Sequence, residues 1–415
     1  MTAFAPAFPR SVFRHKPFAL FWSARVLSTM AFQIQGVAVG WQVYALTHSA
    51  LALGLVGLVH FLPMAALTLV VGHVADRYDR RRIVGACQLV GGLATAALAV
   101  GSAGGWLTSA SIFAAVAVVG AARAFELPSL HALLPQLVPV EVFPRAAAAS
   151  ASAVQTATII GPAAGGLLYA LGAEAPYALA ALLWIAACAL STLIRMVPAQ
   201  RRREPASLAS IFSGFSFIRR NPAILGSISL DLFAVLLGGA TALLPVFARD
   251  ILETGPWGLG LLRSGPAVGA LAMSVFLAHR PLRARVGRTM FRAVILFGLA
   301  TVVFALSRWL WLSVLAMIVL GAADVISVVI RSSLVQIATP DEMRGRVSAV
   351  NALFIGTSNQ LGEFESGVTA ALFATVPAVI LGGVGTILVA LLWMRLFPAL
   401  READTLEVMR PVSRA

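Results

Sequence analysis

The sequence predicts an all-α protein that crosses a membrane twelve times, and three observations lead to this prediction. Hydrophobic residues make up 59% of the 415 residues and charged residues only 12%, whereas a soluble domain carries about 25% charged residues. Apolar runs of about 20 residues, the length that a helix needs to cross a bilayer, recur along the chain. Most arginines are confined to every second segment between these runs.

The expected spans follow from these apolar runs. They lie at residues 18–44, 50–74, 83–103, 107–130, 146–172, 176–196, 223–248, 256–278, 290–306, 309–331, 347–373 and 377–397. The segment before the first span holds Arg10, Arg14 and Lys16 but no apolar core followed by a cleavage site. We therefore expect the first span to be a retained helix and not a signal peptide.

The positions of the arginines predict the orientation of the helices. The net charge of +14 would suggest nucleic-acid binding in a soluble protein, but these arginines do not form one patch. They cluster at 77–82, 145, 201–220, 280–288 and 344–346, while the opposite loops hold only Arg249 and Arg308. Because cytoplasmic loops are enriched in lysine and arginine, both termini are expected in the cytoplasm, and nucleic acid is not expected as a partner.

An internal repeat predicts the domain organisation. A shift of about 206 residues sets "SALALGLVGL" (49–58) over "GPWGLGLLRS" (255–264), and "GAARAFE" (120–126) resembles "GAADVIS" (321–327), as in transporters built from two parallel repeats. We expect a six-helix bundle at 1–196, a cytoplasmic linker at 197–222, a second six-helix bundle at 223–400 and a cytoplasmic tail at 401–415. The linker is expected to form an amphipathic helix, with apolar residues at helical spacing: Leu208, Ile211, Phe212, Phe215 and Ile218.

These features carry a resemblance to a known family. Twelve spans in two halves, with "GHVADRYDRRR" (72–82) between the second and third spans, resemble the major facilitator superfamily over essentially the whole chain. The segments "SLDLFAVLLGGATALLPVFARDI" (229–251) and "NQLGEFESG" (359–367) are similar to a bacterial branch that includes enterobactin-exporter-like and macrolide-efflux-like proteins. The resemblance implies the major facilitator fold and a place in the bacterial cytoplasmic (inner) membrane.

The loop after the second span is the first candidate site. In the family it latches the cytoplasmic side shut, and its aspartate lies near the start of the eleventh span. The matching residues here are Gly72, Asp76, Arg77, Arg80 and Arg81, but Asp79 stands where the family has a second glycine. A carboxylate near a helix N-terminus gains about 0.3–1 kcal/mol, which is weak enough to break in each transport cycle. The alternative is that these arginines only set topology and bind anionic lipid.

The fifth expected span contains "GPAAGG", with Gly161, Pro162, Gly165 and Gly166. Proline kinks a helix and glycine allows neighbouring helices to approach closely. In the superfamily a fuller version of this motif marks antiporters, which export their substrates. Two upstream glycine positions of that version are alanine here, Ala148 and Ala157. The motif therefore indicates either export or simply a tightly packed, kinked helix.

Charged residues inside the spans are the candidates for coupling transport to protons, since intramembrane charges are costly and usually functional. Two pairs occupy matching repeat positions with opposite sign, Arg25 with Asp231 and Arg123 with Asp324. An interior ion pair that breaks when its acid is protonated would serve as a coupling switch, and the alternative is a static bridge. The full candidate set is Arg25, Arg123, Glu126, Asp231, Asp324, Glu363 and Glu365.

The substrate cavity is predicted from the spans that line it in the family. These spans supply aromatic and amide side chains, which suit an amphiphilic organic molecule, although single aromatics could equally face lipid. The candidates are Gln33, Trp41, Phe125, Gln155 and Phe233. The six histidines are scattered and the only lysine, Lys16, is not in a nucleotide-binding loop, so no metal, cofactor or ATP site is expected.

Together these features predict a monomeric secondary transporter and not an enzyme. Its expected partners are the lipid bilayer, protons and a small organic substrate such as a siderophore or a drug, which it would export by proton antiport through alternating access. A facilitator or a proton-symporting importer is the alternative within transport. A membrane sensor that kept the fold but lost transport is the alternative outside it.

Overall fold

The computed structural model describes residues 11–195, 208–280 and 284–404. All regular structure within these ranges is helical. The first half contains α1 (Lys16–Thr47), α2 (Ala50–Arg77), α3 (Arg80–Ala103), α4 (Ser109–Leu133), α5 (Phe143–Tyr169) and α6 (Glu174–Thr192), with short 3-10 turns at Val12–Arg14, Leu134–Gln136 and Val140–Val142.

The second half repeats this pattern with one interruption. It contains α7 (Leu208–Arg220), α8 (Pro222–Leu237), η4 (Ala240–Leu243), α9 (Leu244–Val246), η5 (Phe247–Ile251), α10 (Gly255–His279), α11 (Val286–Leu306), α12 (Leu310–Ala338), α13 (Asp341–Phe373), α14 (Thr375–Leu396) and α15 (Pro398–Arg401).

Polar caps begin several of these helices. Ser49 accepts a hydrogen bond from the backbone of Ala52 at the start of α2, and Thr108 and Ser111 form a reciprocal capping box at the start of α4. Such caps satisfy backbone N–H groups that the helix itself leaves without partners.

Nine helical segments of the described residues are long and apolar enough to cross a membrane. They confirm the expected spans in α2, α3, α4, α6, α10, α11, α12, α14 and the combined stretch Pro222–Ile251. The expected spans in α1, α5 and α13 are also helical, but amides, small polar residues and acids lower their hydropathy. Membrane crossing by these three helices stays a prediction.

The expected span at 223–248 holds as an apolar stretch long enough to cross a membrane, but it is not one regular helix. The helix α8 ends at Leu237, and the chain continues through a 3-10 turn and a π-helix to Ile251. A Cβ on Gly239 would lie 2.3 Å from the carbonyl oxygen of Gly362 in α13. The break therefore brings the backbone of this segment directly against α13, which a side chain at position 239 would prevent.

The helix expected in the linker is confirmed from Leu208 to Arg220 as α7. Ile218 is buried with 1% exposure, whereas Phe215 is 45% exposed. The side chains of Leu208, Ile211 and Phe212 lie outside the described residues, so its apolar face as a whole stays a prediction.

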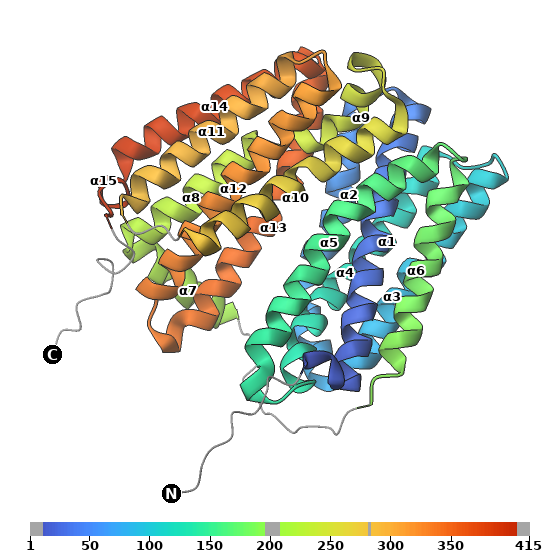
Figure 1. Cartoon of the computed structure of the whole chain (residues 1–415), viewed down its shortest axis with the longest axis horizontal. Coiled ribbons are helices and arrows are strands. Elements are labelled where there is room, and N and C mark those ends of the chain that lie inside the picture. Colours follow the sequence, from blue (N-terminus) through green and yellow to red (C-terminus); the bar gives the residue numbers. More distant parts are fainter. Residues whose placement is uncertain (1–10, 196–207, 281–283, 405–415) are drawn as a thin grey trace, which may run out of the picture.

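The two halves lie side by side and approach each other at the end away from both chain termini (Figure 1). Glycines make this contact close. A Cβ on Gly54 of α2 would lie 2.8 Å from Cα of Gly367 in α13, and one on Gly166 of α5 would lie 3.0 Å from Cα of Gly260 in α10. The Tyr44 hydroxyl of α1 also donates a hydrogen bond to the carboxylate of Asp250 in η5. We call these contacts the inter-half seal.

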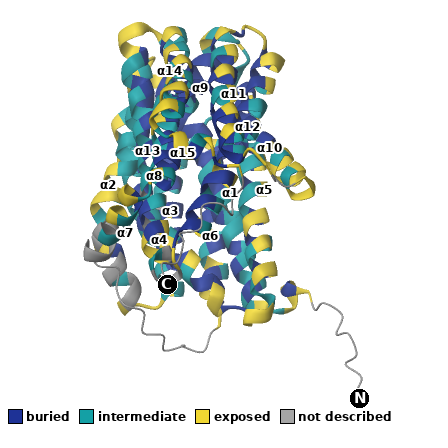
Figure 2. Ribbon diagram, turned by 90° about the vertical axis from the view of Figure 1, so that its left-hand side faces the viewer, coloured by how far each residue is buried: buried dark blue, intermediate teal, exposed yellow. Residues whose placement is uncertain are grey.

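Apolar side chains cover much of the outside of the molecule, and the cores lie mostly within one half each, with Val37 joining the second-half core and Val246 the first-half core. Tyr177 and Ile112 are fully buried in the first half, and Phe247 and Phe304 are fully buried in the second. Leu182 and Leu388 are 62% and 60% exposed. Buried residues concentrate in the interior of the ribbon and exposed ones at its margins (Figure 2). Exposed leucines on this scale are typical of helices that face lipid.

Candidate functional site

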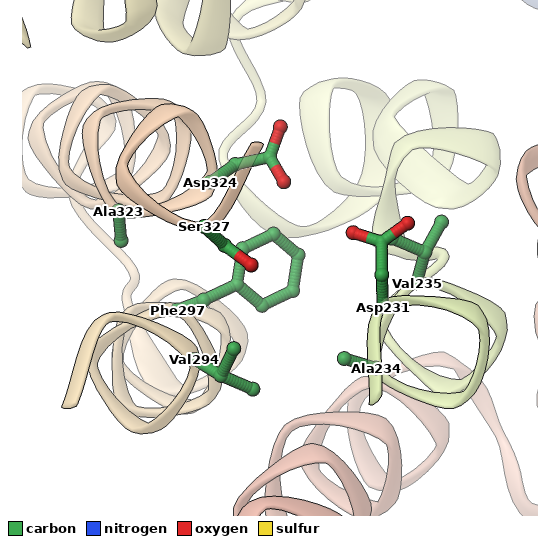
Figure 3. A pocket seen from close by; sticks show the side chains of 8 residues that line it. All are labelled: Asp231, Ala234, Val235, Val294, Phe297, Ala323, Asp324 and Ser327. Carbon is green, nitrogen blue, oxygen red and sulfur yellow. The ribbon is translucent and has the colours of Figure 1, made fainter. Parts of the chain in front are cut away.

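An acidic pocket lies inside the second half, between α8, α11 and α12. The carboxylates of Asp231 (α8) and Asp324 (α12) both face this pocket, with Ser327 and Phe297 between them (Figure 3). Asp231 forms an ion pair with Arg331 of α12, and the two side chains are only 8% and 3% exposed. Because a buried ion needs a counter-charge, Arg331 allows Asp231 to stay ionised in this environment.

Asp324 has no such counter-charge among the described residues. Its carboxylate makes no ion pair there, and the nearby Ser327 hydroxyl is buried without a hydrogen-bond partner. Asp324 is half-buried, and ionising an unpaired carboxyl group away from water costs free energy. When Asp324 is ionised, its negative charge is therefore not compensated on this side of the pocket. A bound proton would remove the charge, and a water molecule would supply the missing hydrogen bonds.

A second polar cluster lies inside the first half. Arg123 and Glu126 of α4 form an ion pair of 3.0 Å. Glu126 also accepts a hydrogen bond of 3.2 Å from Gln88 of α3, and Gln88 accepts one of 2.8 Å from Ser191 of α6. Arg25 of α1 lies within electrostatic range of both Arg123 and Glu126.

The expected pairing of Arg25 with Asp231 and of Arg123 with Asp324 is wrong. The observed ion pairs each lie within one half, Asp231 with Arg331 and Arg123 with Glu126. Equivalent repeat positions occupy equivalent places in separate bundles, so they have no reason to touch. Arg331 was missed because the expected span ended at this charge, whereas α12 continues to Ala338.

Glu363 and Glu365 of α13 point to different neighbours. Glu363 reaches α2, where a Cβ on Gly57 would lie 2.7 Å from its Oε2, and it interacts electrostatically with Arg263 of α10. Glu365 instead accepts a hydrogen bond of 2.6 Å from Thr369 one turn along the same helix. Glu363 and Arg263 thus lie beside helices of the other half, since Arg263 also borders Gly36 of α1.

The candidate gate loop bonds to its own half wherever it is described. Gly72 and Asp76 lie in α2, but their side chains are outside the described residues. Arg77 is exposed, Arg80 donates to the Ala132 carbonyl at 3.3 Å, and Arg81 donates to the Ile194 carbonyl at 2.7 Å. A latch between Asp76 and α13 stays a prediction.

Asp79, which departs from the family pattern, has a clear local role. Its φ of −63° requires no glycine, and its side chain accepts a hydrogen bond from the backbone of Arg81 as the N-cap of α3. The Arg81 side chain also pairs with this carboxylate. The hydrogen bond from Arg81 holds the pKa of Asp79 below its usual range.

The glycines of "GPAAGG" serve two helix contacts. A Cβ on Gly161 would lie 2.6 Å from Cβ of Gln33, and one on Gly165 would lie 3.0 Å from the Ile34 carbonyl, so both glycines admit α1. A Cβ on Gly166 would lie 2.4 Å from the Pro256 carbonyl, and the carbonyl of Pro162 faces Gly260, so this end of the motif admits α10. The motif therefore supports close packing, while its link to transport direction stays a prediction.

The candidate cavity residues do not form one group. Trp41 packs on Tyr169 with ring centroids 6.2 Å apart, and Gln155 donates a 2.7 Å hydrogen bond across the halves to the Ala267 carbonyl. Phe233 packs on Trp393 of α14 at 5.2 Å and is 39% exposed. Phe125 is half-buried in α4. Among these, Gln33 and Gln155 lie in the contact between α1, α5 and α10.

Comparisons with known proteins agree with this architecture. The model of a family described as transmembrane secretion effectors matches residues 2–412. The enterobactin exporter EntS of Citrobacter koseri is 29% identical over 398 residues, which cover 94% of this chain and 93% of that protein. The enterobactin exporter EntS of Salmonella typhi is 28% identical over 400 residues and covers 94% of each.

Solved transporter structures share the fold. The nucleoside transporter NupG superposes with a TM-score of 0.68 at 16% identity, covering 91% of this chain and 99% of that chain. A bacterial homologue of the human lysosomal transporter Spinster, in an inward-facing and occupied conformation, superposes with a TM-score of 0.72 at 13% identity, covering 94% and 97%. At these identities the likeness establishes the fold alone.

Proposed function

Since this chain belongs to the transmembrane secretion effectors of the major facilitator superfamily, we propose that it exports small amphiphilic organic molecules in exchange for protons. Its relatives include proteins named as enterobactin exporters, which favours export of a siderophore-like or drug-like molecule. A secondary transporter of this kind performs no covalent chemistry on its cargo. The substrate, protons and the lipid bilayer are its proposed partners, and the monomer is its proposed working unit.

The observation that carries proton coupling is the half-buried carboxyl group of Asp324, which has no counter-charge among the described residues and faces the ion pair of Asp231 and Arg331 across one pocket. A proton on Asp324 removes the cost of an unpaired charge away from water. Loss of that proton places a second negative charge near Asp231. The pocket therefore differs in electrostatic energy between two protonation states, which is the property that a coupling site needs.

The proposed membrane arrangement has twelve spans, with α1, α5 and α13 among them. The boundaries remain those expected from the repeat, with six-helix bundles at 1–196 and 223–400, a cytoplasmic linker at 197–222 and a cytoplasmic tail at 401–415. The arginine-rich loops are assigned to the cytoplasm by the positive-inside rule, in the inner membrane of a bacterium. The inter-half seal then faces outward, and the arrangement of the halves corresponds to an inward-facing state.

Everted membrane vesicles test this proposal. An inside-acid pH gradient is imposed, and candidate siderophores, macrolides and other amphiphiles are added one at a time while an internal pH dye is followed. Export by proton antiport predicts that one of these compounds dissipates the gradient. Asp324→Asn should abolish this response, whereas Glu365→Gln, which alters an acid whose hydrogen bond among the described residues is to Thr369 of its own helix, should preserve it.

Two results would contradict the proposal. A radiolabelled compound that equilibrates across the membrane regardless of pH would identify a facilitator. A response that survives in Asp324→Asn, at the expression level of the unaltered protein, would remove the acidic pocket from the coupling mechanism.

A further inference from the structure

The charged side chains in the interiors of the two halves, some buried and some half-buried, do not balance, and their imbalances are opposite in sign. The first-half cluster holds two guanidinium groups, Arg25 and Arg123, against one carboxylate, Glu126. It therefore carries one surplus positive charge. The second-half pocket holds two carboxyl groups, Asp231 and Asp324, against Arg331.

The carboxylate of Glu126 is already used by other groups. Its two oxygens accept hydrogen bonds from Arg123 at 3.0 Å and from Gln88 at 3.2 Å. The Nε of Arg25 is buried and has no hydrogen-bond partner within the described part of the chain. Since Glu126 is the carboxylate within range of Arg25, the charge of Arg25 is the one left without a full counter-ion. A buried unpaired charge of this kind is strongly destabilising.

An apolar ring and a second polar side chain border this surplus charge. The guanidinium of Arg123 lies 4.4 Å from the ring centroid of Phe32, and the ring of His60 lies 5.6 Å from that of Phe32. The Nε2 of His60 is buried and also lacks a partner. Arg123 thus lies beside the Phe32 ring and within electrostatic range of both Arg25 and His60.

The cluster lies on the side of its half that faces the other half. Arg25, Phe32 and Gly36 are separated by seven and four residues of α1, which puts them on one face of the helix. A Cβ on Gly36 would lie 3.4 Å from Nη1 of Arg263 in α10, so this face of α1 is turned toward the second half. The Arg123 side chain keeps 11% of its surface exposed, whereas Glu126 keeps 1%.

We infer that this cluster binds the negatively charged oxygen group of an organic anion, with Arg25 and Arg123 holding the charge and Phe32 packing against the adjoining apolar part of the molecule. Arginine suits this task because its planar guanidinium binds carboxylates through two parallel hydrogen bonds. The inference rests on the proposed transport function and specifies its cargo as an anion, carried in the half opposite to the proton pocket.

Thermal unfolding of the purified full-length protein in nanodiscs tests this inference. Sodium benzoate supplies an aromatic ring with a carboxylate, while benzamide with an equal concentration of sodium chloride supplies the same ring without the charge at matched ionic strength. A ligand that binds only the folded state raises the unfolding midpoint by mass action. Benzoate should raise the midpoint of the unaltered protein and of Arg25→Lys, and its effect should fall at least tenfold in apparent affinity in Arg25→Gln.

Controls separate binding from structure. Arg219→Gln changes an exposed arginine of α7 and should leave the benzoate effect intact. Without benzoate, Arg25→Gln should unfold at or above the temperature of the unaltered protein, because it removes a surplus charge, whereas loss of a structural contact would lower that temperature. His60→Leu should weaken the effect of benzoate less than Arg25→Gln does.

Four outcomes would overturn the inference. These are no benzoate effect on the unaltered protein, an equal effect of benzamide with chloride, an unchanged benzoate effect in Arg25→Gln, or a lower unfolding midpoint of Arg25→Gln without ligand. The second outcome would indicate a resident halide or recognition of the neutral ring. Because the assay uses no pH gradient, benzoate binding can succeed or fail independently of the vesicle experiment, and the two proposals are tested separately.

Discussion

Replacing Asp231 with asparagine should cost the protein about 3–5 kcal/mol of stability. The change leaves the positive charge of Arg331 in place, with its side chain only 3% exposed and no carboxylate beside it. At about 1.4 kcal/mol per factor of ten, the unfolding equilibrium should shift by about 10² to 10⁴. The structural reason is that Asp324, the other acid of the pocket, forms no ion pair with Arg331.

A double-mutant cycle isolates the pair. Arg331→Gln alone should also be destabilising, because it leaves Asp231 without its counter-charge. The double variant Asp231→Asn with Arg331→Gln should be more stable than the sum of the two single effects predicts, with a coupling energy of about 0.5–3 kcal/mol. Reversible unfolding in mixed detergent micelles, followed by tryptophan fluorescence, measures all four proteins.

Glu365→Gln serves as the matched control, because the hydrogen bond that Glu365 makes within the described ranges is to Thr369 of its own helix. It should change stability far less than Asp231→Asn. Strict additivity of the Asp231 and Arg331 effects would refute the reasoning, since it would mean that the two charges do not stabilise each other.

Three further predictions concern the inter-half seal and the loop before α3. Gly54→Ala places a methyl group 2.8 Å from Cα of Gly367 and should cost about 1–3 kcal/mol in thermal unfolding, whereas Gly345→Ala, which meets nothing within 4 Å in helix α13, should stabilise the protein by up to about 1 kcal/mol. Tyr44→Phe removes the hydrogen bond to Asp250 and should cost about 1.5–3 kcal/mol; an unfolding midpoint equal to that of the control Tyr169→Phe would contradict this. Asp79→Ala should cost about 1 kcal/mol at pH 7 through loss of the cap. The pKa of Asp79 is lowered in the folded protein, so its contribution is present above the ordinary aspartate pKa of about 3.9. The difference from the unaltered protein should therefore shrink as the pH falls below that value, and unfolding curves measured from pH 7 to pH 3 check it.

The helices were predictable because their apolar runs are long and their ends carry local signals. The end of α12 was placed too early for a physical reason, since a charge in an apolar run resembles a span boundary. Arg331 is instead buried by its pairing with Asp231, and that pairing depends on how α8 packs against α12. Hydropathy along one helix contains no such information.

The break after α8 illustrates a second limit. Residues 238–248 continue the apolar run of α8, so hydropathy joins them into one span, and the backbone break coincides with the close approach of Gly362 to Gly239. The repeat located Arg25, Asp231, Arg123 and Asp324 at equivalent positions, but it could not reveal that each residue interacts inside its own half. The backbone break after α8 and the partners of these charged residues both depend on contacts between helices, which hydropathy and the repeat do not describe.

The crossing of α5 and α10 at Gly166 and Gly260 lies near one end of α10. From Gly260 to the end of α10 at His279 the helix runs about 29 Å, so a tilt of about 10° around this crossing moves its far end by about 5 Å. A small rotation of α10 about this crossing would therefore displace its far end by about the width of a side chain. The glycines matter here because they let the two backbones approach this closely, and a methyl group added at Gly166 or Gly260 would push the helices apart.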